Sequence, residues 1–238
     1  MTDCRTHRWL ALAVVLSTLA PAGSWAEPAH GPAIVGSPKA TDQGWLQRLR
    51  QLLNLQPVEA VGGSRGPAQS RLCLLSPAGI AAAPGQRPDA EPSSSGVLLV
   101  PLASPMLVAS QPLSEIVLEE NGAVLWQALA SSRQPLSSVR PWPIAPIKPG
   151  QELSLKLRAE GAGGSDFVLF RLRLADGPTL AKAQVLQQAL AVDPSAWQRL
   201  LQRAAANGDR EGAAVLLSSP QPWRQQRRLD PQQLCPGG

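Results

Sequence analysis

Residues 114–129 read SEIVLEENGAVLWQAL. Two runs rich in aliphatic and β-branched residues flank Asn121-Gly122. A type I′ turn requires a positive φ at both of its central residues, and Asn-Gly is the pair that most readily supplies it. The stretch therefore predicts a β-hairpin with strands over 114–120 and 123–129.

The pairing of this hairpin predicts which side chains share a face. A two-residue turn with regular pairing places Ile116 and Leu118 on the same face as Leu125. The same register places Trp126 on the opposite face, together with Val117. We therefore expect Trp126 to be an exposed residue of the sheet.

Further strands follow the hairpin at regular intervals. Residues 151–159 and 167–175 alternate apolar and polar residues, which is typical of antiparallel strands with one buried face and one wet face. In the second of these strands Arg171 and Arg173 fall on the wet face. Shorter apolar runs over 71–75 and 96–102 indicate two more strands. The sequence thus predicts a mainly β chain whose domain at 68–176 is an antiparallel β-sandwich.

Segments with helical periodicity lie on both sides of this domain in the sequence. The stretch 41–67 begins with an amphipathic helix, capped at Thr41 or Asp42, and ends in a Gly-rich loop. Over 177–219 apolar residues recur at a spacing of three and four, with breaks at Asp193-Pro194 and at Asn207-Gly208. We expect a C-terminal helical hairpin there that covers a face or edge of the sheet, followed by a flexible tail over 220–238.

The first residues have the pattern of an export signal. Basic residues precede an apolar run from Trp9 to Ala20, and a small-x-small site ends at Ala26. The run is too short to span a bilayer. The sequence therefore predicts a signal peptide over 1–26, a disordered linker over 27–40, and a periplasmic or secreted protein with no transmembrane segment after cleavage.

Two cysteines follow the signal, Cys73 and Cys235. An oxidising compartment permits a disulfide between them, and closing so long a loop would restrict the unfolded chain strongly. The alternative is that Cys73, within Arg71-Leu72-Cys73-Leu74-Leu75, is a buried small apolar residue. The sequence leaves both readings open.

Composition argues against several classes of function. The 238 residues include only 2 histidines and no tyrosine, and the net charge of +5 is spread along the chain. No phosphate loop, dinucleotide fingerprint or nucleophile elbow is present. We therefore expect no catalytic residues, metal, cofactor or nucleic-acid partner, with a hydrolase as the least favoured alternative.

The order of these segments resembles known families. The hairpin and the turn at Pro149-Gly150 resemble immunoglobulin-like and fibronectin type III-like modules, although no tyrosine corner is present. The layout also resembles an uncharacterised family of exported cyanobacterial proteins, through Trp45-Leu46-Gln47-Arg48-Leu49 and Val61-Gly62-Gly63-Ser64-Arg65-Gly66. Residues 189–194 resemble part of a tetratricopeptide repeat. None of these resemblances implies an enzymatic activity.

These observations favour an exported, non-enzymatic interaction module of the cell envelope that binds a protein or a glycan. A helical adaptor for a secreted or outer-membrane partner is the alternative. The candidate binding residues are aromatic or cationic: Trp126, Trp142, Arg171, Arg173 and Trp197. The sequence leaves the partner and the oligomeric state open.

Overall fold

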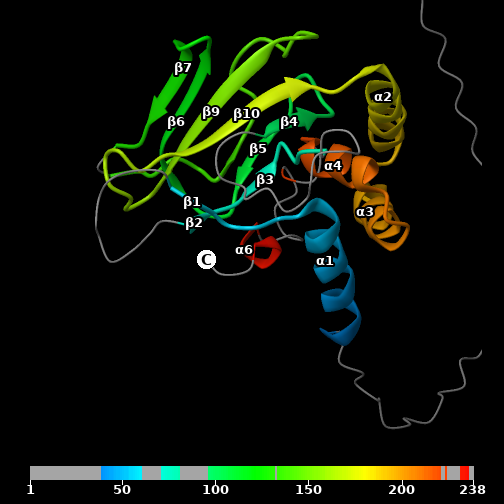
Figure 1. The fold of residues 1–238 in the computed structure, drawn as a ribbon. Helices are drawn as coiled ribbons and strands as arrows, with labels where there is room; N and C mark the ends of the chain where they lie inside the picture. Colours follow the sequence, from blue (N-terminus) through cyan, green and yellow to red (C-terminus); the bar gives the residue numbers. More distant parts are fainter. Residues whose placement is uncertain are drawn as a thin grey trace, which may run out of the picture. The chain divides into compact units, whose positions relative to one another are not determined.

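The computed structural model describes residues 39–60, 71–80, 96–131, 133–220, 223 and 231–235 (Figure 1). The chain divides into two compact units, 1–37 and 38–238, and every described residue belongs to the second. The expected signal peptide and nearly all of the expected linker lie outside the described residues. So do the predicted Gly-rich loop at 61–67 and most of the tail over 220–238.

The hairpin forms as predicted. Strands β6 (Leu113–Glu120) and β7 (Ala123–Leu129) pair antiparallel. Asn121 has a φ of 50° and Gly122 a φ of 81°, as a type I′ turn requires.

The prediction that Trp126 is exposed on the face opposite Leu118 is wrong. The register shifts between Leu118 and Glu119, so that Trp126 lies opposite Leu118 while Val124 lies opposite Glu119. The extra residue in β7 is Leu125, and one extra residue turns every later side chain to the other face. Trp126 is therefore half-buried and packs against the core.

The larger sheet has five strands in the order β4-β10-β9-β6-β7. Strands β9 (Glu152–Ala159) and β10 (Val168–Leu174) show the predicted alternation of buried and exposed residues. Strand β4 (Val97–Val100), however, runs parallel to β10, so this sheet is not wholly antiparallel. The long chain between β4 and β10 can return in either direction, and local pattern does not reveal which.

A smaller sheet has three strands in the order β3-β5-β8. These are β3 (Leu74–Ser76), β5 (Leu107–Ala109) and β8 (Val139–Arg140). The strand expected over 71–75 is divided at Cys73, since β2 (Arg71–Leu72) pairs with β1 (Val58–Glu59) instead.

The two sheets share one apolar core. Leu74 and Leu107 of the smaller sheet join Ile116, Leu155 and Leu172 of the larger sheet in one buried cluster. Since alternate residues of a strand point to opposite faces, the neighbours of Leu74 point away from this core. Cys73 and Leu75 belong to a second buried cluster on the other side of the smaller sheet.

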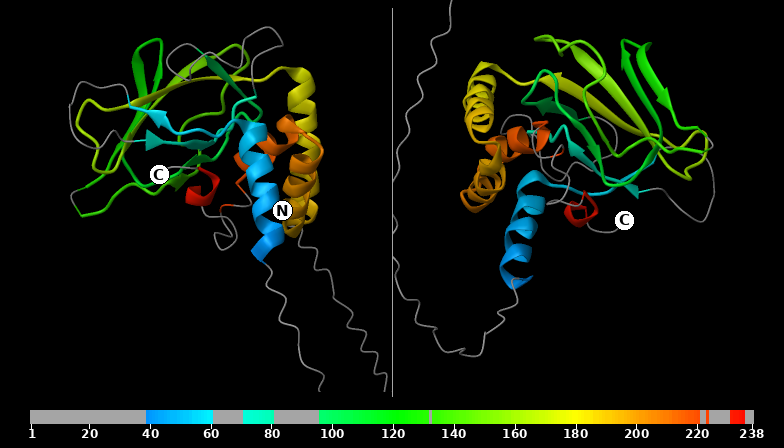
Figure 2. Two further views of the ribbon diagram at one scale, coloured as in Figure 1. Left: turned by 60° about the horizontal axis from the view of Figure 1, so that its bottom comes forward. Right: turned by 180° about the vertical axis from the view of Figure 1, so that it is seen from behind.

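Helices make up most of that second cluster. They are α1 (Lys39–Leu53), α2 (Gly177–Val192), the 3-10 turn η1 (Pro194–Ala196), α3 (Trp197–Ala206), α4 (Arg210–Ser218) and α6 (Pro231–Leu234). The side chains of α1, α3 and α4 meet those of β3 and β5 there, and Figure 2 shows these helices grouped together. The chain is thus a mixed structure of helices and sheets, with more helix than the expected hairpin.

The breaks between these helices follow the sequence signals. Asp209 accepts a hydrogen bond from the backbone N–H of Gly212, at 2.9 Å, and so caps α4. Asp193 accepts one from the N–H of Ser195, at 3.0 Å. Helix α2 begins at Gly177, with Pro178 in its first turn, and Thr179 is buried inside the helix.

A disulfide joins Cys73 to Cys235, with Cα atoms 6.1 Å apart. Cys73 is 1% exposed and Cys235 5% exposed, and both belong to the cluster between the helices and the smaller sheet. The bridge therefore ties the C-terminal segment with α6 to the point where β2 and β3 divide.

Candidate functional site

In the described part of the chain, one edge strand of the larger sheet lies close to one edge strand of the smaller sheet. Strand β7 is an edge of the larger sheet and β8 an edge of the smaller sheet. The Arg140 guanidinium carbon from β8 lies 5.8 Å from the centre of the Trp126 ring from β7. That distance is typical of a cation–π contact.

Strand β7 exposes apolar side chains along its length. Val124 is 56% exposed, Leu125 43% and Leu129 59%, which makes three of the six large apolar side chains that are exposed in the described part of the chain. The strand contains no charged residue and no proline. Edge strands of natural sheets are ordinarily protected by lysine, proline or a short length. Among the described residues, the one such protective feature of β7 is its bulge at Leu125.

The hydrogen-bond pattern shows which amides of β7 face the free edge. The Ala130 N–H donates to the Ser114 carbonyl at 2.8 Å. In an antiparallel pair, bonded and unbonded residue pairs alternate. The amides of Trp126 and Ala128 are therefore bonded to β6, whereas those of Gln127 and Leu129 point away from the sheet.

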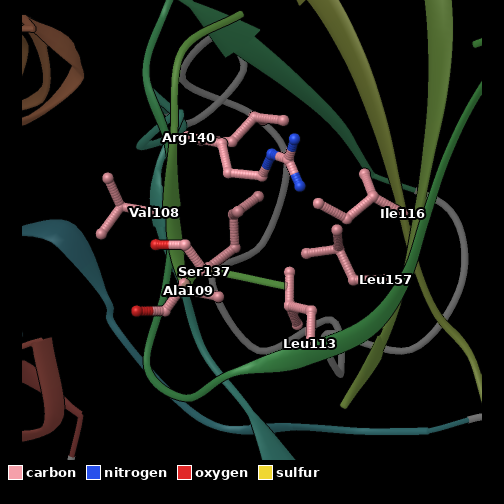
Figure 3. A pocket seen from close by; sticks show the side chains of 10 residues that line it. Val108, Ala109, Leu113, Ile116, Ser137, Arg140 and Leu157 are labelled. Carbon is pink, nitrogen blue, oxygen red and sulfur yellow. The ribbon is translucent and has the colours of Figure 1, made fainter. Parts of the chain in front are cut away.

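A small pocket lies between the two sheets close to this edge. It is lined by Leu74, Leu107, Val108, Ala109, Leu113, Ile116, Ser137, Ser138, Arg140 and Leu157. Arg140 points into it toward Ile116 and Leu157 of the facing sheet (Figure 3). Its cavity volume is about 10 Å³, which is room for about one water molecule. Pockets for cofactors and similar organic ligands measure roughly 300–1,000 Å³.

The chemistry of this lining is simple. Besides apolar side chains it offers two hydroxyls, from Ser137 and Ser138, and one guanidinium. The Ser137 hydroxyl donates to the Val139 carbonyl at 3.0 Å and accepts from the Val139 N–H at 3.2 Å. Among the described residues, the lining holds no carboxylate, imidazole or thiol.

Arg171 and Arg173 lie on the opposite face of the larger sheet from Trp126. Both are exposed on β10, as predicted. The same face carries ion pairs across the strands, from Arg158 to Glu115 at 2.5 Å and from Lys156 to Glu119 at 2.7 Å. The structure therefore does not bring these arginines together with the tryptophans in one site.

The other two candidate tryptophans lie elsewhere. Trp142 is partly buried against the core between the sheets, and its indole N–H donates to the Ala145 carbonyl at 3.1 Å. Trp197 is 6% exposed, and its indole N–H donates to the Leu216 carbonyl at 2.8 Å. Trp197 thus connects α3 to α4 in the core, and it presents no surface to a partner.

A charged cluster joins α2 to the start of α4. Lys182 Nζ lies 2.6 Å from Asp209 Oδ1 and 3.5 Å from Glu211 Oε2. Burial raises the pKa of Asp209, but the hydrogen bonds from Lys182 and the Gly212 N–H outweigh it and leave this pKa lowered. Each of these groups is used to hold the two helices together.

Within the described residues, no helix is both long and apolar enough to cross a bilayer. The described part of the chain also contains no group of three or more acidic, histidine or cysteine side chains that could hold a metal ion. Comparison with protein-family models, with curated proteins and with solved structures gives no match to this chain. The resemblances drawn from the sequence stay predictions.

Sequence reasoning missed Arg140. It lies in a segment with no regular alternation, just before Pro141-Trp142. Arg140 reaches the Trp126 ring because β8 lies close to β7, and these two strands are brought together by contacts between segments far apart in the chain. Trp126 was identified, but the bulge that turns it toward Arg140 carries no clear signal in the sequence.

Proposed function

We propose that this protein is an exported, non-enzymatic interaction module of the cell envelope, periplasmic or secreted, built on an immunoglobulin-like sandwich. Its partner is another envelope protein, which adds an extended segment to the free edge of β7. The shared core of the two sheets supports the sandwich. The apolar, uncharged edge of β7 is the single observation that carries the function.

Strand addition uses both features that β7 offers. The outward amides of Gln127 and Leu129 supply main-chain hydrogen bonds to an incoming strand, which give affinity. The exposed side chains of Val124, Leu125 and Leu129 supply apolar area, which is lost from water when a partner covers them. Exposed apolar groups concentrated on one strand are typical of an interaction site.

The environment of the tryptophans favours a protein partner over a glycan. A sugar ring stacks on an aromatic face that is open to solvent. The Trp126 ring is half-buried with Arg140 over it, and Trp142 packs against the core. The site instead offers unpaired backbone groups and aliphatic side chains, which suit a polypeptide.

Charge favours a foreign strand over a second copy of β7. The guanidinium of Arg140 lies beside the edge, and within the described residues it forms no ion pair. Strand β7 contains no acidic residue, so pairing of two β7 strands would leave both copies of Arg140 without a counter-ion. An incoming segment that carries a carboxylate complements this charge.

Site-specific photo-cross-linking tests the proposal. A photoreactive residue at position 129 in β7 is compared with one at position 192 at the end of α2, because Leu129 and Val192 are exposed by 59% and 89%. We expect position 129 to cross-link a distinct envelope protein, and Leu125→Lys to abolish that adduct. The same Leu125→Lys change leaves folding intact, since Leu125 is 43% exposed.

Three outcomes would count against strand addition. The first is the same adducts from both positions, and the second is an adduct at position 129 that Leu125→Lys leaves unchanged. The third is a cross-linked dimer of this chain as the main product. That result would show that β7 pairs with a second copy of this chain and not with a different protein.

A further inference from the structure

Helix α2 has apolar side chains on two opposite faces. The buried residues of α2 are Thr179, Ala183 and Leu190. Ala181, Val185 and Val192 each lie two residues further along the chain, which in an α-helix is a rotation of about 200°. These three side chains are therefore on the side of α2 that faces away from the core. All three are exposed, Val185 by 65% and Val192 by 89%.

The exposed face of α2 carries no charged side chain. The one charged residue of the helix is Lys182, whose Nζ lies 2.6 Å from Asp209 of the neighbouring helix turn. Figure 1 shows α2 at the outer side of the helical group, where none of the other labelled elements covers it. A surface helix ordinarily has a polar outer face, and a helix that is apolar all round is ordinarily buried. The second apolar face of α2 therefore indicates an interaction surface.

The order of residues on this face suits a second copy of the same chain. The exposed, uncharged positions, called the α2 stripe below, are Pro178, Ala181, Val185, Ala189 and Val192. Their spacings of three, four, four and three residues are the same in both directions. An antiparallel copy centred on Val185 therefore places Pro178 opposite Val192 and Ala181 opposite Ala189. Such self-complementarity is what a two-fold symmetric interface requires.

We propose that the α2 stripe pairs antiparallel with the α2 stripe of a second copy of this chain, about a two-fold axis at Val185. Charge is compatible with this pairing, because the stripe is uncharged and neither copy buries an unpaired ion. The positive N-terminal end of each helix lies beside the negative C-terminal end of its partner. Ala181 and Ala189 are small, so the two helix axes can approach closely. The packed face points away from the axis, so the remainder of each protomer does not obstruct the pairing.

The size of the contact determines how strong the dimer is. Helix α2 has 16 residues, so it is about 24 Å long, and a helix with its side chains is about 10 Å wide. One helix per protomer therefore covers a patch of roughly 240 Å², compared with about 800 Å² per partner in a stable complex. We expect a reversible dimer with a Kd on the order of 100 µM.

Sedimentation equilibrium of the disulfide-bonded chain, from about 10 µM to 1 mM, measures this Kd. Val185→Asp should weaken the dimer at least tenfold, because it places two like charges against each other on the axis. Gln187→Asp is the matched control and should leave the Kd unchanged. Gln187 is also exposed on α2, but it lies two residues after Val185 and so about 200° away from it. Circular dichroism shows whether both variants are folded.

Disulfide trapping tests the antiparallel geometry, in a chain that also carries Cys4→Ser. Val185→Cys should form a covalent dimer on mild oxidation, because residue 185 meets its own copy on the axis and a disulfide needs Cα atoms within about 7 Å. Val192→Cys should not, since two copies of residue 192 lie about 21 Å apart along the helices. A mixture of Pro178→Cys and Val192→Cys should cross-link.

Three results would overturn the proposal. They are a protein that stays monomeric at 1 mM, a dimer that Val185→Asp weakens no more than Gln187→Asp does, and a Val192→Cys chain that cross-links to itself as readily as Val185→Cys. The first result would leave the stripe to a different protein. None of them bears on strand addition, because a photoreactive residue at position 192 reports a second copy of this chain whereas position 129 reports the foreign partner.

Discussion

Removing the Cys73–Cys235 bridge should cost this protein a large part of its stability. The perturbation is Cys73→Ala, Cys235→Ala and the two changes together. Both sulfurs lie in the core between the helices and the smaller sheet, and the bridge spans a sequence separation of 162 residues. Because the loop is so long, the bridge excludes many conformations of the unfolded chain.

The magnitude follows from the length of that loop. In the chain-entropy relation, a loop of 162 residues lowers the entropy of the unfolded chain by about 17 cal/mol/K. At 25 °C this corresponds to a free energy of unfolding larger by about 5 kcal/mol. The stability of a typical domain is about 5–15 kcal/mol, so loss of the bridge should bring unfolding close to ambient conditions.

Urea denaturation of the four proteins, followed by circular dichroism, measures the free energy of unfolding. Either single variant loses the whole bridge, so each single variant and the double variant should lose about the same amount. A double-mutant cycle then gives a coupling energy nearly as large as one single loss. Small losses that add up in the double variant would refute the reasoning and leave two unlinked, buried thiols.

Three further changes test other parts of the structure. Gly122→Ala should lower the free energy of unfolding by about 1 kcal/mol in thermal denaturation, because Gly122 has a φ of 81°. Trp197→Phe should lower it by about 1–3 kcal/mol, because the buried Leu216 carbonyl loses its donor, yet envelope binding should persist. The pKa of Asp209 is below the ordinary value of 3.8, so Asp209 stabilises the fold above pH 3.8 and this contribution is lost as the pH falls through its folded pKa. Asp209→Asn should therefore flatten the acid-induced decrease in stability, measured by urea denaturation over that pH window.

Local signals in the sequence were sufficient for much of the fold. The Asn121-Gly122 turn, the alternation over 151–159 and the helix break at Asn207-Gly208 each depend on residues within a few positions of one another. Such features can be inferred without knowing the partner of each strand. The exposure of Arg171 and Arg173 followed from the same alternation.

Other features depend on contacts between distant segments. The parallel pairing of β4 with β10 and the division of 71–76 at Cys73 both depend on which strands meet. The bulge at Leu125 turns the Trp126 side chain to the other face of the sheet. A one-residue shift of this kind leaves no signal in the amino-acid composition.

The candidate site was identified only in part for the same reason. Trp126 was named, but its neighbour Arg140 and the unprotected edge of β7 follow from the order of strands in the two sheets. Trp197 was named as a binding residue because it is aromatic, but it lies on the apolar face of its helix. That face is the one that helices bury against their own core, as Trp197 does.

Amide hydrogen exchange along β7 tests the central claim most directly. The isolated chain is compared with the same chain mixed with its own envelope fraction, residue by residue. Strand addition predicts that exchange at Gln127 and Leu129 is fast in isolation and slow in the mixture. Trp126 and Ala128 should be protected in both, because their amides are bonded to β6. Unchanged fast exchange at Gln127 and Leu129, in a mixture where the chain is bound to a partner, would contradict the account.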